Sequence, residues 1–171
     1  MDKKQYDNYV KILRSELIPA MGCTEPIAIA YAAAKARQVL GAMPERMVAR
    51  CSGNIIKNVK GVNVPNAGGQ KGVQVAAILG ALAGDPDLEL QVISQVPEEA
   101  VEEVRKLNKQ RICTCELEEG VENLFIRIEA FAGEDNAVVV IKTKHNHISL
   151  IEKNGEVLLQ AEDIVTADAG D

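Results

Sequence analysis

Cys23 is the residue whose type and position most strongly suggest chemistry, and it lies in the segment Met-Gly-Cys-Thr-Glu-Pro at residues 21–26. A helix is predicted to start directly after it, and the unpaired N–H groups and dipole of a helix start favour an anionic thiolate. A thiolate here is a candidate ligand of a metal or cluster, or a candidate nucleophile. The neighbouring Thr24 and Glu25 are candidates for capping the helix or contacting the ammonium group of a substrate.

A second candidate is the segment at residues 52–72, which is rich in asparagine, glycine and lysine and fits neither a helix nor a strand pattern. Its amides donate and accept hydrogen bonds, and backbone N–H groups at the start of the following helix suit a carboxylate or phosphate. Its glycines match neither a Walker loop nor a dinucleotide-binding loop. A structured surface loop with helix caps is the alternative interpretation. The candidate anion-binding residues are Asn54, Lys57, Asn58, Asn66, Gly68 and Gly69.

His145 and His147 form the third candidate, because residues two apart on a strand project from the same face. Their imidazoles could bind a metal or a substrate, but two ligands do not complete a metal site and exposed strand histidines are common. Cys113 and Cys115 also share a strand face, where packing is favoured over metal binding. Cys51 is the weakest candidate for metal binding.

The first half of the chain is predicted to position these residues mainly on helices. Apolar residues at helical spacing predict a helix over residues 6–17, and Pro19 ends it. Ala-rich helices are predicted over residues 26–40 and 71–83. A short strand is predicted between them, over residues 47–51.

The second half is predicted to consist mainly of strands, with one helix over residues 97–108. Alternating or continuous apolar runs predict the strands, and Asn154-Gly155 predicts a hairpin turn. Helices first and mostly antiparallel strands later indicate an α+β domain, in which Ala-rich helices pack on the sheet. This domain is expected to span residues 1–161, followed by an acidic tail or truncated end at residues 162–171. The predicted strands cover residues 88–92, 113–117, 124–129, 138–141 and 148–159.

Composition narrows the function further. The chain has 171 residues with 47% hydrophobic and 26% charged residues, typical of one globular domain. Aromatic residues make up 3%, which argues against stacking on single-stranded nucleic acid. No membrane span or signal peptide is recognisable, so a cytoplasmic protein with reduced cysteines is expected.

Charge is distributed unevenly along the chain. Residues 1–80 hold 11 Lys and Arg against 5 Asp and Glu, a net charge of +6, whereas residues 81–171 hold 8 against 20, a net charge of −12. The basic half is consistent with contact to an anion. Two solvated faces of one domain are the alternative.

The motifs together resemble the N-terminal part of the serine dehydratase alpha-like family, which includes L-cysteine desulfidase. The resemblance runs in order over about residues 5–160. It implies a cytoplasmic iron–sulfur lyase that removes the β-substituent of a small L-amino acid without pyridoxal phosphate. L-cysteine would give pyruvate, ammonia and sulfide, whereas L-serine would give pyruvate and ammonia. The matching segments are residues 21–26, 52–59 (Ser-Gly-Asn-Ile-Ile-Lys-Asn-Val), 64–72 (Val-Pro-Asn-Ala-Gly-Gly-Gln-Lys-Gly) and 144–148 (Lys-His-Asn-His-Ile).

The resemblance also implies roles for the candidate residues. In such enzymes a [4Fe–4S] cluster with an open iron acts as a Lewis acid on the leaving group, while a base takes the α-proton. Cys23 would be a cluster ligand or a group at the cluster, and His145 and His147 would line the same site. The substrate carboxylate would bind to the amide-rich segment, at Asn54, Lys57, Asn58, Asn66, Gly68 and Gly69.

The chain departs from this family in its length. The family continues into a mostly helical C-terminal half that carries the remaining cluster cysteines, so this chain alone is not expected to hold the cluster. A fragment, one subunit of a split enzyme, or a deliberately shortened protein would each explain this. Its expected partners are a small L-amino acid and the helical half or a second subunit, with a homo-oligomer left open. A non-catalytic module that binds a small ligand is the alternative function.

Overall fold

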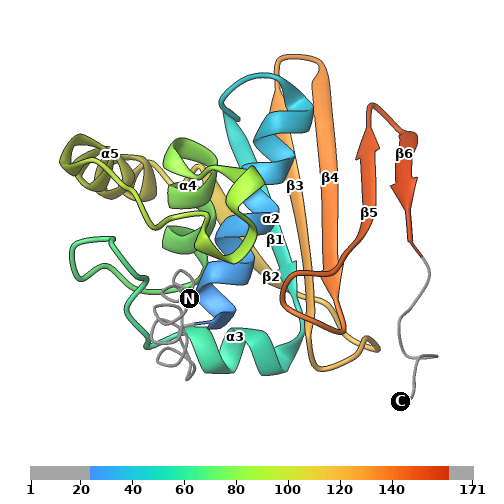
Figure 1. Ribbon diagram of the computed structural model, residues 1–171, viewed down its shortest axis with the longest axis horizontal. Coiled ribbons are helices and arrows are strands. Elements are labelled where there is room, and N and C mark those ends of the chain that lie inside the picture. Colours follow the sequence, from blue (N-terminus) through green and yellow to red (C-terminus); the bar gives the residue numbers. More distant parts are fainter. Residues whose placement is uncertain (1–23, 162–171) are drawn as a thin grey trace, which may run out of the picture.

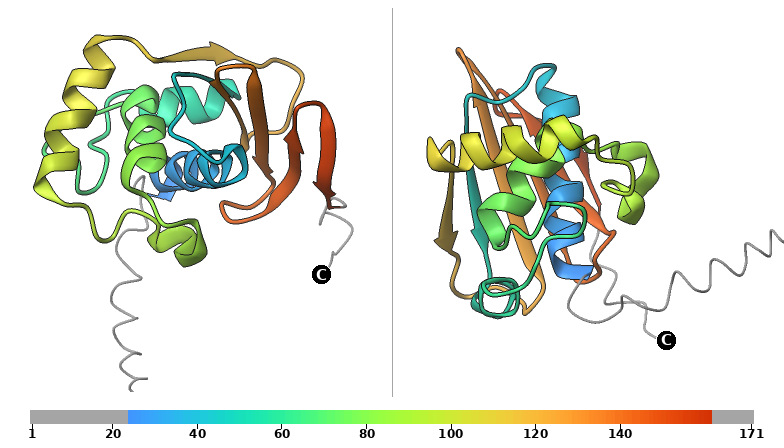
Figure 2. Two further views of the ribbon diagram at one scale, coloured as in Figure 1. Left: turned by 90° about the horizontal axis from the view of Figure 1, so that it is seen from above. Right: turned by 90° about the vertical axis from the view of Figure 1, so that its left-hand side faces the viewer.

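Residues 24–161 form two layers in the computed structural model, with helices packed against one face of a six-stranded sheet (Figure 1). Two further directions show the helices gathered on that one side (Figure 2). The predicted α+β architecture is therefore confirmed. The structure describes only these residues, so the helix predicted over residues 6–17, Cys23 and the acidic tail at residues 162–171 lie outside the described part.

The helical layer is centred on two small-residue helices, as the Ala-rich sequence predicts. A Cβ atom at Gly80 would lie 2.6 Å from Ala30 Cα and would overlap the Ala30 carbonyl. The absence of a side chain at Gly80 therefore allows the two backbones to approach closely. None of the helices between residues 24 and 161 is long and apolar enough to span a membrane. The helices are α2 (Thr24–Leu40), α3 (Gly53–Val59), α4 (Val73–Ala83), η2 (Pro86–Gln91) and α5 (Glu98–Lys109).

The sheet has the strand order β2-β1-β3-β4-β5-β6, and only the β1 and β2 pair is parallel. Side chains alternate between its faces, so Met47, Ala49 and Cys51 are fully buried against the helices. The predicted turn at Asn154-Gly155 is confirmed, because both residues have positive φ angles, 53° and 83°. The strands are β1 (Arg46–Cys51), β2 (Cys113–Leu117), β3 (Phe125–Ala132), β4 (Asp135–Lys142), β5 (Ile148–Lys153) and β6 (Glu156–Gln160).

The structure corrects three local predictions. Residues 53–59 form α3, because the Ser52 side chain accepts a hydrogen bond from Ile55 N at 3.3 Å and caps the helix. Residues 86–91 form the 3-10 helix η2 in place of the predicted strand, and the Asp85 side chain caps it by accepting from Asp87 N. A five-residue alternating run is too short to distinguish the two structures. His145 and His147 lie in the loop between β4 and β5 and not on a strand.

Candidate functional site

Three motifs that lie far apart in the sequence meet at the carboxylate of Glu25. This residue is in the first turn of α2, Asn58 is in α3, and His145 is in the loop between β4 and β5. Asn58 Nδ2 donates to Glu25 Oε2 at 3.4 Å, and His145 Nε2 lies 3.9 Å from the same oxygen. All three elements lie at the α3 end of the sheet (Figure 1). The cluster of Glu25, Asn58 and His145 is the candidate site.

The electrostatics of this cluster favour a neutral imidazole beside a carboxylate. The side chains of Glu25 and His145 are 19% and 32% exposed. Burial lowers the pKa of His145, and this effect exceeds the opposing influence of the Glu25 charge. At 3.9 Å the two groups are too far apart for a direct hydrogen bond. His145 can therefore accept a proton at neutral pH.

Two buried imidazole nitrogens in the loop between β4 and β5 lack hydrogen-bond partners among residues 24–161. The Nε2 atoms of His145 and His147 are buried, and neither has a hydrogen-bond partner among the described residues. A buried polar group without a partner costs about 1–3 kcal/mol, so such groups in a folded protein call for an explanation. A polar group from outside the described residues would supply one.

The helix α3 supplies the amide part of the predicted site. Asn54 and Asn58 are four residues apart, so they lie on the same face of α3, and Lys57 is exposed beside them. Thr24 opens α2 next to Glu25 and is partly exposed. The structure thus gathers the first part of the amide-rich segment near Glu25, on a helix and not on the loop that the sequence predicts.

The second part of that segment packs against the helical layer. The backbone of Asn66 has a φ angle of 64°, and its Nδ2 donates to Ile93 O at 2.8 Å. A Cβ at Gly68 would lie 2.7 Å from Val101 Cγ1 on α5, whereas Gly69 faces open space. These contacts give Asn66 and Gly68 a structural role. Substrate binding by Asn66, Gly68 and Gly69 stays a prediction.

Ser52 is a positioning residue that the sequence patterns did not single out. Its hydroxyl donates to Asn123 O while accepting from Ile55 N, so it ties the start of α3 to the loop before β3. It is only 4% exposed. The signal was present, because a serine directly before a Gly-Asn pair and an apolar residue is a typical helix cap.

The described cysteines lie on the helix-facing side of β1 and β2. Burial raises the pKa of the Cys113 thiol to about 12 and also raises that of Cys51 and Cys115. Between residues 24 and 161, no group of three or more His, Cys, Asp or Glu side chains is placed to hold a metal ion. The packing interpretation of Cys113 fits its 3% exposure, while Cys115 is partly exposed.

Several known proteins that are similar to this chain share one name. A protein of Finegoldia magna is 51% identical over 152 residues, which cover 88% of this chain and 36% of the relative. Proteins of Treponema denticola and Lachnoclostridium phytofermentans are 41% and 43% identical, over 94% and 92% of this chain. These homologues are UPF0597 proteins. The chain spans only 36–38% of the length of these UPF0597 proteins, so it corresponds to a part of them.

The UPF0597 similarity supports the expected relation to a longer protein. No family model and no solved structure matches the chain. The resemblance to the serine dehydratase alpha-like family therefore stays a prediction, and the activity that it implies is a proposal.

Proposed function

We propose that the chain is the substrate-binding N-terminal portion of an iron–sulfur L-cysteine desulfidase, which converts L-cysteine and water into pyruvate, ammonia and hydrogen sulfide. One observation carries this proposal: three of the motifs behind the family resemblance supply Glu25, Asn58 and His145, which meet at one carboxylate. If these segments matched the family only by chance, the fold would not be expected to bring the three side chains together.

The described residues alone do not fit a [4Fe–4S] cluster. A cluster binds thiolates, but the three described thiols are packed on the sheet with raised pKa values, Cys113 at about 12. In the proposal, Cys23 and cysteines of the portion outside this chain hold the cluster. That cluster supplies Lewis-acid chemistry to the leaving group.

The described side chains have the properties needed to hold and deprotonate a small amino acid. The Glu25 carboxylate would bind the ammonium group, and the Asn54 and Asn58 amides with Lys57 would bind the carboxylate. His145 Nε2 would accept the α-proton as the Cβ–S bond breaks and sulfide leaves. The 2-aminoacrylate product would tautomerise to an imine, which water hydrolyses to pyruvate and ammonia.

Reconstitution with the missing portion tests the proposal. The chain would be combined, without oxygen, with the part of the Finegoldia magna relative outside the matched residues, and pyruvate and sulfide would be measured. We expect His145→Gln to lower kcat by about 100-fold or more, the usual contribution of a general base. Asn146→Gln, an exposed change in the same loop, is the matched control. A reconstituted pair that forms neither product from any small L-amino acid would refute the lyase proposal.

The same residues also suit two other functions. L-serine dehydratase differs only in its leaving group, so the assay includes L-serine, and pyruvate without sulfide would favour it. A non-catalytic module would use the buried Nε2 atoms of His145 and His147 to hold a ligand without chemistry. Calorimetry with L-cysteine and L-serine, before and after Cys23→Ser, tests this function. A module keeps its ligand after the change, whereas the enzyme loses activity or cluster occupancy.

A further inference from the structure

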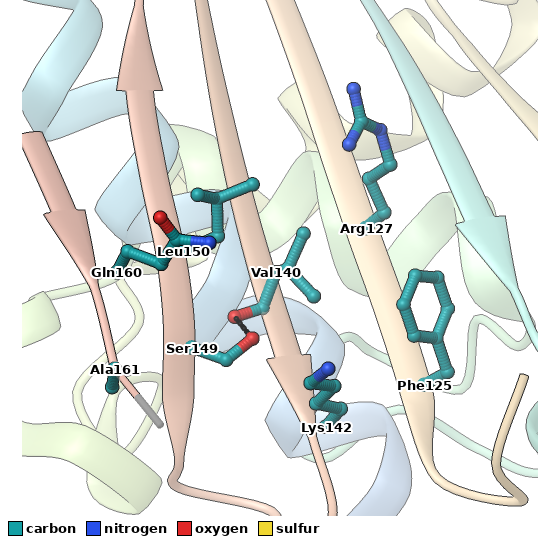
Figure 3. Close-up of a pocket in the computed structure, with 8 residues that line it drawn as sticks. All are labelled: Phe125, Arg127, Val140, Lys142, Ser149, Leu150, Gln160 and Ala161. Carbon is teal, nitrogen blue, oxygen red and sulfur yellow. Dashed lines mark hydrogen bonds between the residues drawn. The ribbon is translucent and has the colours of Figure 1, made fainter. Parts of the chain in front are cut away.

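The face of the sheet opposite the helices has no described element packed on it. The register places Arg50, Arg127, Val140, Leu150 and Gln160 side by side on this face, one on each of five neighbouring strands. In Figure 3 the helices lie behind these strands, and the labelled side chains stand in front. We call this surface, together with strand β6, the open face.

Four charged side chains on the open face are paired with one another within the sheet. Arg50 pairs with Glu116 at 2.8 Å and with Glu129 at 3.2 Å, and Arg127 pairs with Glu129 at 2.8 Å. Burying a charge is costly unless it keeps a partner. A partner protein could therefore cover this region without leaving any of these four side chains unpaired.

Beside the ion pairs lies an apolar region with a hollow. Val138 and Val140 on β4 are 7% and 5% exposed, although no described element lies over them. The hollow has a volume of about 710 Å³, and Leu150 and Ser149 form part of its wall (Figure 3). The apolar surface continues onto the edge strand β6, where Leu158 is 55% exposed.

An exposed apolar patch beside a free edge strand usually marks an interaction site. A sheet face whose ion pairs are internal and whose apolar part continues into an unpaired, apolar edge strand favours association. The neighbouring Val157 and Leu159 are 49% and 41% exposed, so the exposure extends along the strand and is not limited to Leu158. Edge strands that must stay free usually carry charges or prolines along their length, and residues 157–159 have neither.

We propose that the open face is the docking surface for the portion of the UPF0597 proteins that lies outside this chain. The matched region makes up only 36–38% of the length of the relatives, so most of each longer protein lies outside it. Gln160 and Ala161, the last described residues, line the hollow, so the described domain ends on this face. The docked portion would present an apolar surface to Leu150 and Leu158.

The inference uses the partner named in the proposed function but not the lyase chemistry, so the two can fail separately. The portion of the Finegoldia magna relative outside the matched residues would be purified and mixed with the full chain. Sedimentation velocity would give the dissociation constant, and hydrogen exchange would locate the contact. We expect slowed exchange in β5 and β6, with no change in α5.

Two variants and a matched control make the test specific. Leu158→Asp and Leu150→Glu would weaken binding about tenfold or more, because a charge enters an apolar contact. Leu88→Asp is the control, since Leu88 is 42% exposed on η2 in the helical layer and should change binding less than about twofold. Circular dichroism would check that each variant folds, and Leu158 on the exposed edge is the safer of the two positions.

Three outcomes would overturn the inference. One is that the two polypeptides do not bind each other. Another is protection on α4 and α5 with equal weakening by Leu88→Asp, which would place the contact on the helical side. The third is protection of β6 that depends on the concentration of this chain alone, because a second copy would then be the occupant of the open face.

Discussion

Replacing Gly80 with alanine tests whether the close approach of α2 and α4 holds the helical layer together. A Cβ at this position would lie 2.6 Å from Ala30 Cα and 2.7 Å from the Ala30 carbonyl carbon. Both neighbours are backbone atoms, which cannot rotate away as the end of a flexible side chain can. The helices must therefore separate by about 1 Å, which forfeits a quarter to a half of the dispersion energy across the contact.

The expected loss of stability follows from two opposing effects. Alanine is favoured over glycine inside a helix by about 1 kcal/mol. Overpacking a core costs about 1–3 kcal/mol and sometimes more, and contact with rigid backbone places Gly80 at the upper end of this range. We expect Gly80→Ala to lower the free energy of unfolding by about 2 kcal/mol, measured by urea denaturation.

A matched substitution separates this effect from the general effect of adding a methyl group. A Cβ at Gly53 would meet only Leu117 Cδ1, at an ordinary 3.6 Å. Gly53→Ala should therefore leave stability within about 0.5 kcal/mol of the parent. Because Glu25 lies in the first turn of α2, Gly80→Ala should also shift the NMR signals of His145. Unchanged or greater stability of Gly80→Ala would refute the close-packing argument.

Three further predictions concern charge and burial. Glu25→Gln should lower the pKa of His145 further, measured by NMR titration, because the Glu25 charge is the influence that raises it. The pKa of His145 in the folded protein lies below its ordinary value of 6.5. The contribution of His145 to stability is therefore complete above pH 6.5 and is lost as the pH falls through the folded pKa. Urea denaturation at several pH values would show this loss. Arg37→Ala should cost about 1–2 kcal/mol in thermal or urea unfolding, because Arg37 Nη1 donates to Ala81 O at 3.1 Å at the end of α4. In a variant with both Cys23→Ser and Cys115→Ser, Cys113 should react with iodoacetamide only as fast as the protein opens, because burial raises the pKa of its thiol to about 12. Fast labelling of Cys113 in the folded variant, located by mass spectrometry, would contradict this.

Elements that carry strong local signals could be predicted from the sequence, and elements that depend on tertiary contacts could not. The Ala-rich α2 and the hairpin at Asn154-Gly155 carry their own local signals, so the sequence sufficed for both. The helix α3 has only seven residues, and its stability depends on a cap from Ser52 and on burial of Ile55 and Val59. Its asparagines and lysine instead suggest a loop, so tertiary contacts decide its structure.

The candidate site shows the same division between local and tertiary information. Each motif was recognisable alone, because Glu25 precedes a helix and His145 lies in an unusual His-Asn-His run. Their meeting was implied by the family resemblance alone and does not follow from the local patterns, since it depends on the sheet that joins β1, β3, β4 and β5 in one register. The assumption that His145 lies on a strand failed because β4 ends at Lys142, before the histidines.

The arrangement of charge at Glu25 would allow the proposed ammonium acceptor and the proposed base to coexist at neutral pH. Glu25 lies in the first turn of α2, where the helix dipole stabilises negative charge. His145 would ordinarily gain a proton beside such a carboxylate, but burial lowers its pKa by more than the carboxylate raises it. Exposing His145 to water would remove the influence that lowers its pKa and would favour the protonated imidazole. Burial of His145 is therefore as necessary to the proposed chemistry as either side chain.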